Sequence, residues 1–369
     1  MERILESIRD VGGVSIVTHN DPDGILAAAI CCRALASKGV GARDVDMYFE
    51  SPSTVQKNAS RFLDPDGEDF VGGFIILLDL PYNENADIWI DHHESETDIV
   101  PNEATLAVVQ DTTRSAAMLA NEFFLDLVGT STLLCDPRFL EFVDARDTGG
   151  PVGDIPEAFE TLSLAIHEDR NDYAFFEELV RTLAKSDDVA KIVQEGKVIL
   201  KAKNERRKVN RGIKHLENTF ASDDFDTFMS AIDRESSKIA GDETKLRSFL
   251  VQDLLLFLDF SDFDNSEKEK KQGISVPYYI IDEILKRIGH SYSFLLVFRG
   301  DDKTGDIHCT IGINQSEEKD IATNDVDISQ LAKDLGGGGH DYAAGFVIPP
   351  EKFLETIERV AIFVNVHIG

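Results

Sequence analysis

Three apolar runs near the start of the chain each end in aspartate or histidine, and this pattern restricts the fold more than any other feature. The runs are VSIVTH (14–19), GGFIILLDL (72–80) and ADIWIDHH (86–93). Two helical patterns, at 25–39 and 113–129, each end in glycine, a common helix stop. Unbroken apolar strands accompanied by helices are typical of a parallel sheet covered on both faces. The sequence therefore predicts an α/β domain at the N-terminus.

The first of these strands leads into a cluster of polar residues, THNDPDG (18–24). In an open α/β sheet the ligand site lies beyond the carboxyl ends of the strands. In an extended segment alternate residues point the same way, so we expect His19, Asp21 and Asp23 to face one side. One imidazole and two carboxylates suit a divalent metal ion, although an ordinary polar loop has the same composition.

The other two strands end in similar residues. Asp79 follows the second run, where a lone carboxylate is also typical of a helix cap or a turn. Asp91, His92 and His93 end the third run. Adjacent histidines on a strand point to opposite sides, so we expect one to bind metal and the other to meet the substrate. Asp91 is placed to fix the tautomer of a histidine.

A fourth cluster, FVDARDTGG, adds Asp144 and Asp147 where a predicted helix passes into a loop. Together the four clusters supply enough ligands for two ions. Oxygen and imidazole ligands without cysteine favour Mn²⁺ or Mg²⁺ over structural zinc. Two ions about 3.5–4 Å apart clamp an in-line displacement at phosphorus. The clusters therefore predict a two-metal site suited to phosphoester hydrolysis.

The chain has 369 residues, which exceeds one ordinary core and predicts two domains. We place a catalytic domain at 1–190, a basic linker helix at 191–220 and a second domain at 221–369. Within the second domain, about 221–272 is an acidic insertion in which 245–260 is expected to be a helix followed by a loop.

The second domain returns to an α/β pattern after the insertion. We expect a helix at 276–289, strands at 293–300 and 306–314, and a helix at 325–335 that runs into GGGGH (336–340). Four glycines let backbone N–H groups approach a phosphate or carboxylate closely, whereas one glycine is enough to stop a helix. A flexible turn is the plain alternative.

The net charge of −31 argues against binding long duplex nucleic acid. A phosphate-bearing substrate would need local cations to overcome this field. The one basic island is 197–215, which is either a solvated linker helix or a cationic wall beside an anionic ligand. The four cysteines form no CxxC pair, no apolar run is long enough for a membrane, and no signal-peptide core is visible. We therefore expect a cytoplasmic protein.

The motifs THNDPDG, LLDLP, IDHH, VDARD and GGGGHDYAAGF occur in an order that resembles the DHH family of phosphoesterases with a DHH-associated C-terminal domain. The resemblance covers most of residues 14–150 and 273–347 and looks closest to the oligoribonuclease (nanoRNase) branch. RecJ-type exonucleases and cyclic-dinucleotide phosphodiesterases are relatives. It implies an N-terminal parallel-sheet DHH domain and a smaller C-terminal α/β domain joined by a helical linker.

The resemblance also implies roles for individual residues. One Mn²⁺ ion would be held by His19, Asp21 and Asp79. The second ion, with Mg²⁺ as the alternative metal for both, would be held by Asp23, Asp79, His92 and Asp144, or Asp147 in place of Asp144. His93 would contact the scissile phosphate, with Asp91 as its catalytic partner.

Substrate contacts are implied in both domains. The candidates are Gly336, Gly337, Gly338, Gly339, His340, Arg114, Ser115 and Arg299. Arg114 and Ser115 stand at a helix start, where phosphates bind readily. His340 would be a donor to the substrate rather than a metal ligand. Many relatives carry an Arg-Ser pair where this chain has Asn314 and Gln315, and Arg299 is the candidate replacement.

The implied function is a metal-dependent phosphodiesterase of short single-stranded oligonucleotides or small nucleotides, such as a cyclic dinucleotide or a 3′-phosphorylated adenylate. A RecJ-like single-strand-specific exonuclease is the first alternative, but it needs an extended basic groove with aromatic stacking positions. A non-catalytic replication or repair partner on the same fold is the second, although such proteins usually lose metal ligands. RNA or DNA preference, polarity of attack, and monomer or homodimer stay open.

Overall fold

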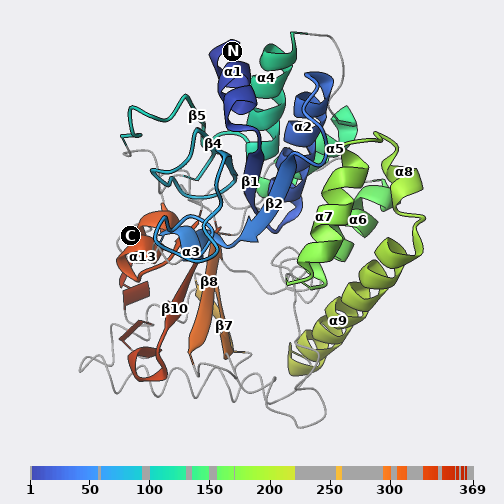
Figure 1. Cartoon of the computed structure of the whole chain (residues 1–369). Helices are drawn as coiled ribbons and strands as arrows, with labels where there is room; N and C mark the ends of the chain where they lie inside the picture. The colour runs from blue at the N-terminus through green and yellow to red at the C-terminus, as the bar shows by residue number, and fades with distance from the viewer. Residues whose placement is uncertain are drawn as a thin grey trace. The chain divides into compact units, whose positions relative to one another are not determined.

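The computed structural model describes two compact units, Met1–Glu205 and Arg206–Gly369, which we treat separately (Figure 1). The described residues are 2–56, 60–93, 100–129, 135–148, 156–169, 171–220, 255–259, 294–300, 306–313, 327–339, 343–353, 355–356, 359–360 and 362–363.

A parallel sheet forms the centre of the first unit. Its strands are β1 (Val14–His19), β2 (Val45–Glu50), β3 (Phe74–Leu78), β4 (Ile88–Asp91) and β5 (Ala107–Gln110). They pair in the order β2-β1-β3-β4-β5, every pair parallel, which confirms the predicted α/β class. The sequence did not predict the edge strands β2 and β5. The first mixes acidic with apolar residues, and the second is short and only partly buried.

Nine helices are described in or at the end of this unit. They are α1 (Glu2–Val11), α2 (Pro22–Ser37), α3 (Pro52–Gln56), α4 (Ala116–Val128), α5 (Pro137–Asp147), α6 (Glu157–His167), α7 (Tyr173–Leu183), α8 (Val189–Ile192) and α9 (Gly196–Phe220). Helices α6 to α9 occupy most of the described residues between 157 and 220. Within the described part of the chain, no helix has both the length and the apolar composition that crossing a membrane requires.

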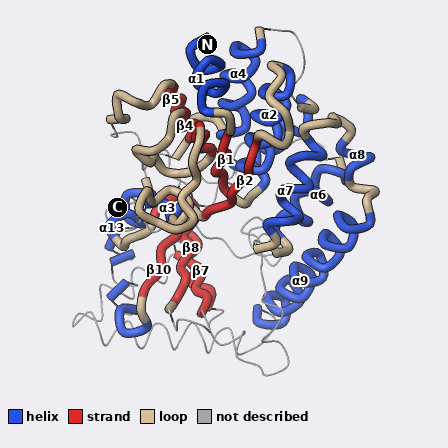
Figure 2. Tube along the Cα trace, in the orientation of Figure 1, coloured by secondary structure: helices blue, strands red, loops and turns tan. Residues whose placement is uncertain are grey.

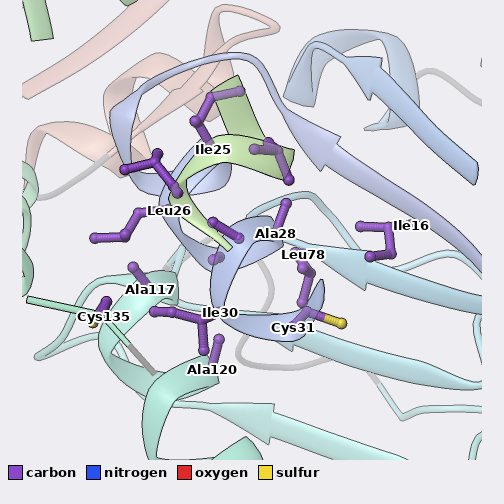
Figure 3. Packing of buried hydrophobic residues seen from close by; sticks show 14 of the residues in the cluster. Ile16, Ile25, Leu26, Ala28, Ile30, Cys31, Leu78, Ala117, Ala120 and Cys135 are labelled. Atoms are coloured by element: carbon purple, nitrogen blue, oxygen red, sulfur yellow. The ribbon is translucent and has the colours of Figure 1, made fainter. Parts of the chain in front are cut away.

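Helix α2 is the hub of the main core because it contacts β1, β3, α4, α5 and α7. Helix α2 is rich in small residues, and alanines on α4 pack against it. Figure 3 shows Ile30 of α2 beside Ala117 and Ala120 of α4, all of them fully buried. Small side chains let the two helices approach closely. This packing brings the start of α2 near the start of α4.

The opposite face of the sheet is covered mainly by irregular chain rather than by long helices. A second apolar cluster there joins Phe62 and Val71 to Trp89 of β4. The Trp89 indole donates a hydrogen bond to the Leu80 carbonyl at 2.9 Å, which ties the segment after β3 to the sheet. These loop segments are part of the tan tube in Figure 2. Both faces of the sheet are covered, as expected, one by helices and the other mainly by loops.

The second unit has a mixed sheet of β6 (Leu255–Asp259), β7 (Phe294–Gly300), β8 (Ile307–Ile313), β9 (Gly338–Gly339) and β10 (Ala343–Ile348). The order is β6-β7-β8-β10-β9, with β6 parallel to β7 and the other pairs antiparallel. Helix α13 (Ile328–Asp334) packs on it, and a 3₁₀ turn, η4 (Pro350–Lys352), follows β10.

One prediction in this unit was wrong. The run at 245–260 was expected to be helical, but its described part, Leu255–Asp259, is a strand paired with β7. A short run of bulky apolar residues carries no periodicity that separates a buried strand from a buried helix. The helix expected at 276–289 lies outside the described residues. The strands predicted at 293–300 and 306–314 and the helix at 325–335 agree with β7, β8 and α13.

Candidate metal centre

The turn from β1 into α2 places the first cluster of polar side chains. Helix α2 begins at Pro22, with Asp21 as its N-cap, so Asp23 lies in a helical turn and not in an extended segment. Asp21 Oδ1 accepts a hydrogen bond from the Gly24 N–H at 3.0 Å. Its other oxygen, Oδ2, lies 3.0 Å from His19 Nδ1. The alternation expected for an extended segment therefore ends at Asp21, and Asp23 joins a different group of side chains.

Gly24 makes this tight turn possible. A Cβ atom at Gly24 would overlap the carbonyl of His19. The Gly24 carbonyl also accepts a hydrogen bond from the buried Thr18 hydroxyl at 2.8 Å. The glycine of the THNDPDG motif is therefore required by the close approach of α2 to the end of β1.

Asp79 lies directly after β3 and has a φ of 54°, in the left-handed region. Its side chain is almost completely buried, and its two oxygens face different histidines. Asp79 Oδ2 is 3.4 Å from His19 Nδ1. Asp79 Oδ1 is 3.4 Å from His92 Nε2. This carboxylate therefore lies between two sets of potential ligands.

The two histidines after β4 lie together, with ring centroids 4.6 Å apart. The expectation that they point to opposite sides was wrong, because the strand ends at Asp91 and its alternation does not continue. His92 Nε2 is 3.0 Å from Asp147 Oδ2 and 3.7 Å from Asp23 Oδ2. His93 Nδ1 is 4.0 Å from Asp79 Oδ1.

Asp91 is fully buried and contacts His93 rather than solvent. Asp91 Oδ1 and His93 Nδ1 are 2.8 Å apart. Burial alone would lower the pKa of His93, but the Asp91 carboxylate raises it above its usual value. Asp91 is therefore placed to orient the His93 ring and to stabilise its protonated form.

The two aspartates of the fourth cluster have separate partners. The sequence analysis preferred Asp144, but the structure brings Asp147 to His92 and Asp23. Asp144 instead accepts a hydrogen bond from the Ser115 backbone N–H at 2.7 Å. The two residues are three positions apart on α5, so they lie on nearly the same face of the helix but about one turn apart along its axis, one beside His92 and the other beside Ser115.

These side chains form three overlapping groups that could each hold a metal ion. The groups are His19, Asp21 and Asp79; Asp23, His92 and Asp147; and Asp79, His92 and His93. In each group the potential ligand atoms lie within 4.8 Å of one another.

The electrostatics of the cluster indicate a cation. Burial, together with the neighbouring Asp79 and Asp147, raises the pKa of Asp23 well above its usual value. Burial also raises the pKa of Asp147 to about 7, against the opposing effect of His92. Such carboxylates repel one another in a buried place. Asp79 Oδ2 is buried, with His19 Nδ1 3.4 Å away. The oxygen-rich set with imidazole nitrogens fits divalent ions of the Mn²⁺ or Mg²⁺ type.

The histidines respond to these acids. Burial alone would lower the pKa of His19, but Asp21 and Asp79 raise it to about 10. For His92, burial again opposes the change, while Asp79, Asp147 and Asp23 raise the pKa to about 11. Without a metal, both rings are therefore protonated at neutral pH.

The predicted phosphate contacts at the start of α4 have other partners. Ser115 is fully buried and is the N-cap of α4, where its Oγ accepts from the Met118 N–H at 3.3 Å. Arg114, which precedes α4, pairs with Glu122 of that helix, and both side chains are exposed. The next two backbone N–H groups, those of Ala116 and Ala117, donate to Asp23 at 2.7 and 2.8 Å. Sequence reasoning missed these donors, because a backbone N–H has no residue signature.

The glycine-rich segment begins as a helix stop in the second unit. Gly336 has a φ of 81°, and its N–H and that of Gly337 bond back to Lys333 and Ala332, a Schellman cap of α13. A Cβ at Gly337 or Gly339 would overlap β10, whereas a Cβ at Gly338 would meet open space. Three of the four glycines thus have a structural reason, and Gly338 has none.

Several predicted substrate residues lie beyond what is described. His340, Asn314 and Gln315 fall outside the described residues, and for Arg299 only the backbone, in β7, is described.

The basic island begins in α9 with lysines that serve packing. Lys201 is largely buried and lies 3.0 Å from Glu168 and 2.9 Å from Asp172. Lys197 Nζ donates to Glu178 at 2.9 Å. These two charges hold α9 against the acids around α6 and α7, as expected of a structural helix.

Comparison with known proteins gives one domain match and a similar overall fold. Residues 279–365 match the family model of the DHHA1 domain. The pGpG-specific phosphodiesterase PggH from Vibrio cholerae has a similar fold, with a TM-score of 0.51 and 17% identity, over 96% of this chain and 99% of that one. RecJ from Thermus thermophilus, in complex with Mn²⁺, matches with a TM-score of 0.48 and 16% identity, over 99% of this chain and 54% of RecJ. None of the curated proteins matches the sequence.

The parallel sheet with a His/Asp cluster at its carboxyl edge, the PggH-like fold and the DHHA1 match agree with one another. The chain therefore has a fold similar to that of PggH, and its residues 279–365 match the DHHA1 domain.

Proposed function

We propose that this chain is a phosphodiesterase that uses two divalent metal ions to hydrolyse short oligonucleotides or small nucleotides. The observation that supports this most strongly is the position of Asp79. One of its oxygens lies 3.4 Å from His19 and the other lies 3.4 Å from His92. A buried carboxylate between two sets of nitrogen and oxygen donors has the geometry of a bridging ligand.

Each ion then has its own ligands beside this shared carboxylate. His19, Asp21 and Asp79 would hold the first ion, and Asp23, Asp79, His92 and Asp147 would hold the second. Mixed carboxylate and imidazole donors suit Mn²⁺, with Mg²⁺ as the alternative.

A metal pair, when bound, activates a water molecule and neutralises charge on the phosphoryl oxygens. The protein's own part is orientation and proton placement. Asp91 holds His93 at Nδ1 and favours its charged form. The other ring nitrogen of His93, Nε2, then donates a hydrogen bond to the scissile phosphate, and buried Asp91 acts through His93 as a positioning residue.

The substrate is a small nucleotide or a short single strand. A net charge of −31 disfavours long polyanions. The fold resembles that of a protein named as a pGpG-specific phosphodiesterase, which supports the same size of substrate. The glycine segment 336–339, with His340 and Arg299, supplies the substrate contacts of the DHHA1 domain.

The test is hydrolysis, with Mn²⁺, of labelled RNAs and DNAs from two to about twenty-five nucleotides, together with a cyclic dinucleotide and a 3′-phosphorylated adenylate. Asp79→Ala removes the proposed shared ligand. Asp126→Asn, at an exposed position of α4, is the matched control. Turnover of the shortest substrates or small nucleotides that is lost only in Asp79→Ala supports the proposal. Efficient degradation of long strands supports a RecJ-like exonuclease instead. A wild-type protein inert on every substrate contradicts both.

A further inference from the structure

The start of α4 is occupied by carboxylates from two other helices. The Ser115 N–H donates to Asp144 Oδ1 at 2.7 Å. The Ala116 and Ala117 N–H groups donate to the two oxygens of Asp23, at 2.7 and 2.8 Å. These N–H groups have no partner within their own helix, and they carry its positive end. Two acids from α5 and α2 therefore share one helix terminus.

Both oxygens of Asp23 are fixed by this arrangement. Asp23 is 1% exposed, and each of its oxygens accepts from a different residue of α4. A carboxylate oxygen has a second lone pair, so Asp23 can hold these bonds and also face an ion beside His92. Because the first N–H groups of α4 hold these oxygens, the position of the start of α4 sets the direction in which the second lone pair points.

Asp144 holds the backbone of Ser115, the N-cap residue of α4. It lies on α5, 29 positions along the chain from Ser115, and α5 packs against α4. The same helix carries Asp147, whose Oδ2 is 3.0 Å from His92 Nε2. Helix α5 thus reaches the cluster by two routes, directly through Asp147 and indirectly through Asp144, the start of α4 and Asp23.

We propose that Asp144 is a positioning residue that fixes Asp23 for metal binding by holding the Ser115 N–H at the start of α4. The inference rests on the proposed function, because it concerns the ion held by Asp23, His92 and Asp147. Residues that orient a metal ligand typically change metal affinity by about 10–100-fold when removed. Asp144 therefore acts on one ion and leaves the ion of His19, Asp21 and Asp79 in place.

The test is a Mn²⁺ titration of the full chain, followed by the electron paramagnetic resonance signal of free Mn²⁺. The wild type is expected to bind two ions. Asp144→Ala is expected to weaken one of them by about 10–100-fold and to leave the other within a few-fold. Asp144→Asn keeps an oxygen acceptor for the Ser115 N–H and is expected to bind both ions nearly as the wild type does.

A second pair of variants tests the donor instead of the acceptor. Ser115 has a φ of −68°, which proline also adopts. Ser115→Pro removes the N–H and is expected to behave like Asp144→Ala. Ser115→Ala removes the hydroxyl cap but keeps the N–H and is expected to retain both ions. This pair decides the question if Asp144→Ala does not fold.

Asp136→Ala is the control for a loss of stability that does not involve the start of α4, because it removes the side-chain cap of α5. It is expected to lower the melting temperature without weakening either ion. Hydrogen exchange of the metal-free protein gives a readout that needs no metal: the amides of Ala116 and Ala117 are expected to exchange faster in Asp144→Ala than in Asp136→Ala.

The outcomes separate the two proposals. If the wild type binds no Mn²⁺, the proposed function fails. If the wild type binds two ions and Asp144→Ala binds them equally well, the role of Asp144 is wrong while the metal site stands. If Asp144→Asn binds Mn²⁺ as weakly as Asp144→Ala does, the proposed role is also overturned. An oxygen acceptor for the Ser115 N–H would then not be enough to hold Asp23 in place.

Discussion

Asp79 and His92 meet across the ends of neighbouring strands, with Asp79 Oδ1 3.4 Å from His92 Nε2. Asp79 is the one non-glycine residue with a positive φ among those the structure describes. Aspartate tolerates the left-handed region better than most residues, although the conformation still costs roughly 1 kcal/mol. Strain kept at a residue whose two oxygens face two histidines is expected of a functional site rather than of an ordinary turn.

The protonated histidines predict how metal binding depends on pH. Without metal, His19 has a pKa of about 10 and His92 of about 11, so both rings carry a proton at pH 7. A metal ion must displace such protons, and apparent Mn²⁺ affinity should rise about tenfold per pH unit for each proton displaced. Calorimetric titrations at neutral pH in buffers of different ionisation enthalpy measure the protons released. An affinity that is constant between pH 6 and 8 would contradict this prediction.

Gly24→Ala should disable the cluster through the backbone. The added Cβ would overlap the carbonyl of His19, so β1 and α2 must separate. We expect a loss of about 1–3 kcal/mol in the free energy of unfolding and a clear loss of Mn²⁺ affinity. Gly13→Ala is the matched control, because a Cβ there meets open space. Equal effects of the two substitutions on Mn²⁺ affinity would show that the close approach at Gly24 is irrelevant.

Much of the first unit follows from its sequence. The apolar runs ending at His19, Asp79 and Asp91 mark the three central strands because buried parallel strands are apolar along their whole length. Convergence of their ends follows from the topology of an open parallel sheet. The edge strands carry no comparable signal, because their residues are only partly buried.

The finer geometry of the site depends on features that residue patterns do not record. The choice between Asp144 and Asp147 depends on which turn of α5 lies beside His92 and which lies beside the start of α4. The grouping of Asp23 with His92 depends on α2 beginning at Pro22 rather than on strand alternation. The backbone donors of Ala116 and Ala117 are supplied by any residue type except proline.

The glycine segment offers a test of substrate binding that separates ligand contact from folding. A Cβ at Gly338 meets open space, so Gly338→Ala should leave the melting temperature within about 2 °C of the wild type. If a nucleotide approaches this backbone, the same change should raise KM for the substrate. Gly337→Ala is the contrast, since its Cβ would overlap the carbonyl of Gly345 and should destabilise the second unit. An unchanged KM in Gly338→Ala would remove this glycine from the substrate contacts.

Lys201 should matter for stability and not for metal binding. Its ammonium group lies 3.0 Å from Glu168 and 2.9 Å from Asp172 in a largely buried place. Lys201→Met would leave those acids without their cation and should cost about 1–3 kcal/mol in the free energy of unfolding. Lys203→Met, at an exposed position of the same helix, should change it by less than about 0.5 kcal/mol. Urea unfolding measures both, and a reversed order would contradict the structural role of Lys201.

The most direct test of the two-metal site is anomalous diffraction at the manganese edge from crystals grown with Mn²⁺. The account predicts two anomalous peaks, one on each side of the Asp79 carboxylate. The first should lie beside His19 and Asp21, and the second beside Asp23, His92 and Asp147. A single peak, or two peaks that do not share Asp79, would contradict the bridging role on which the proposed function rests.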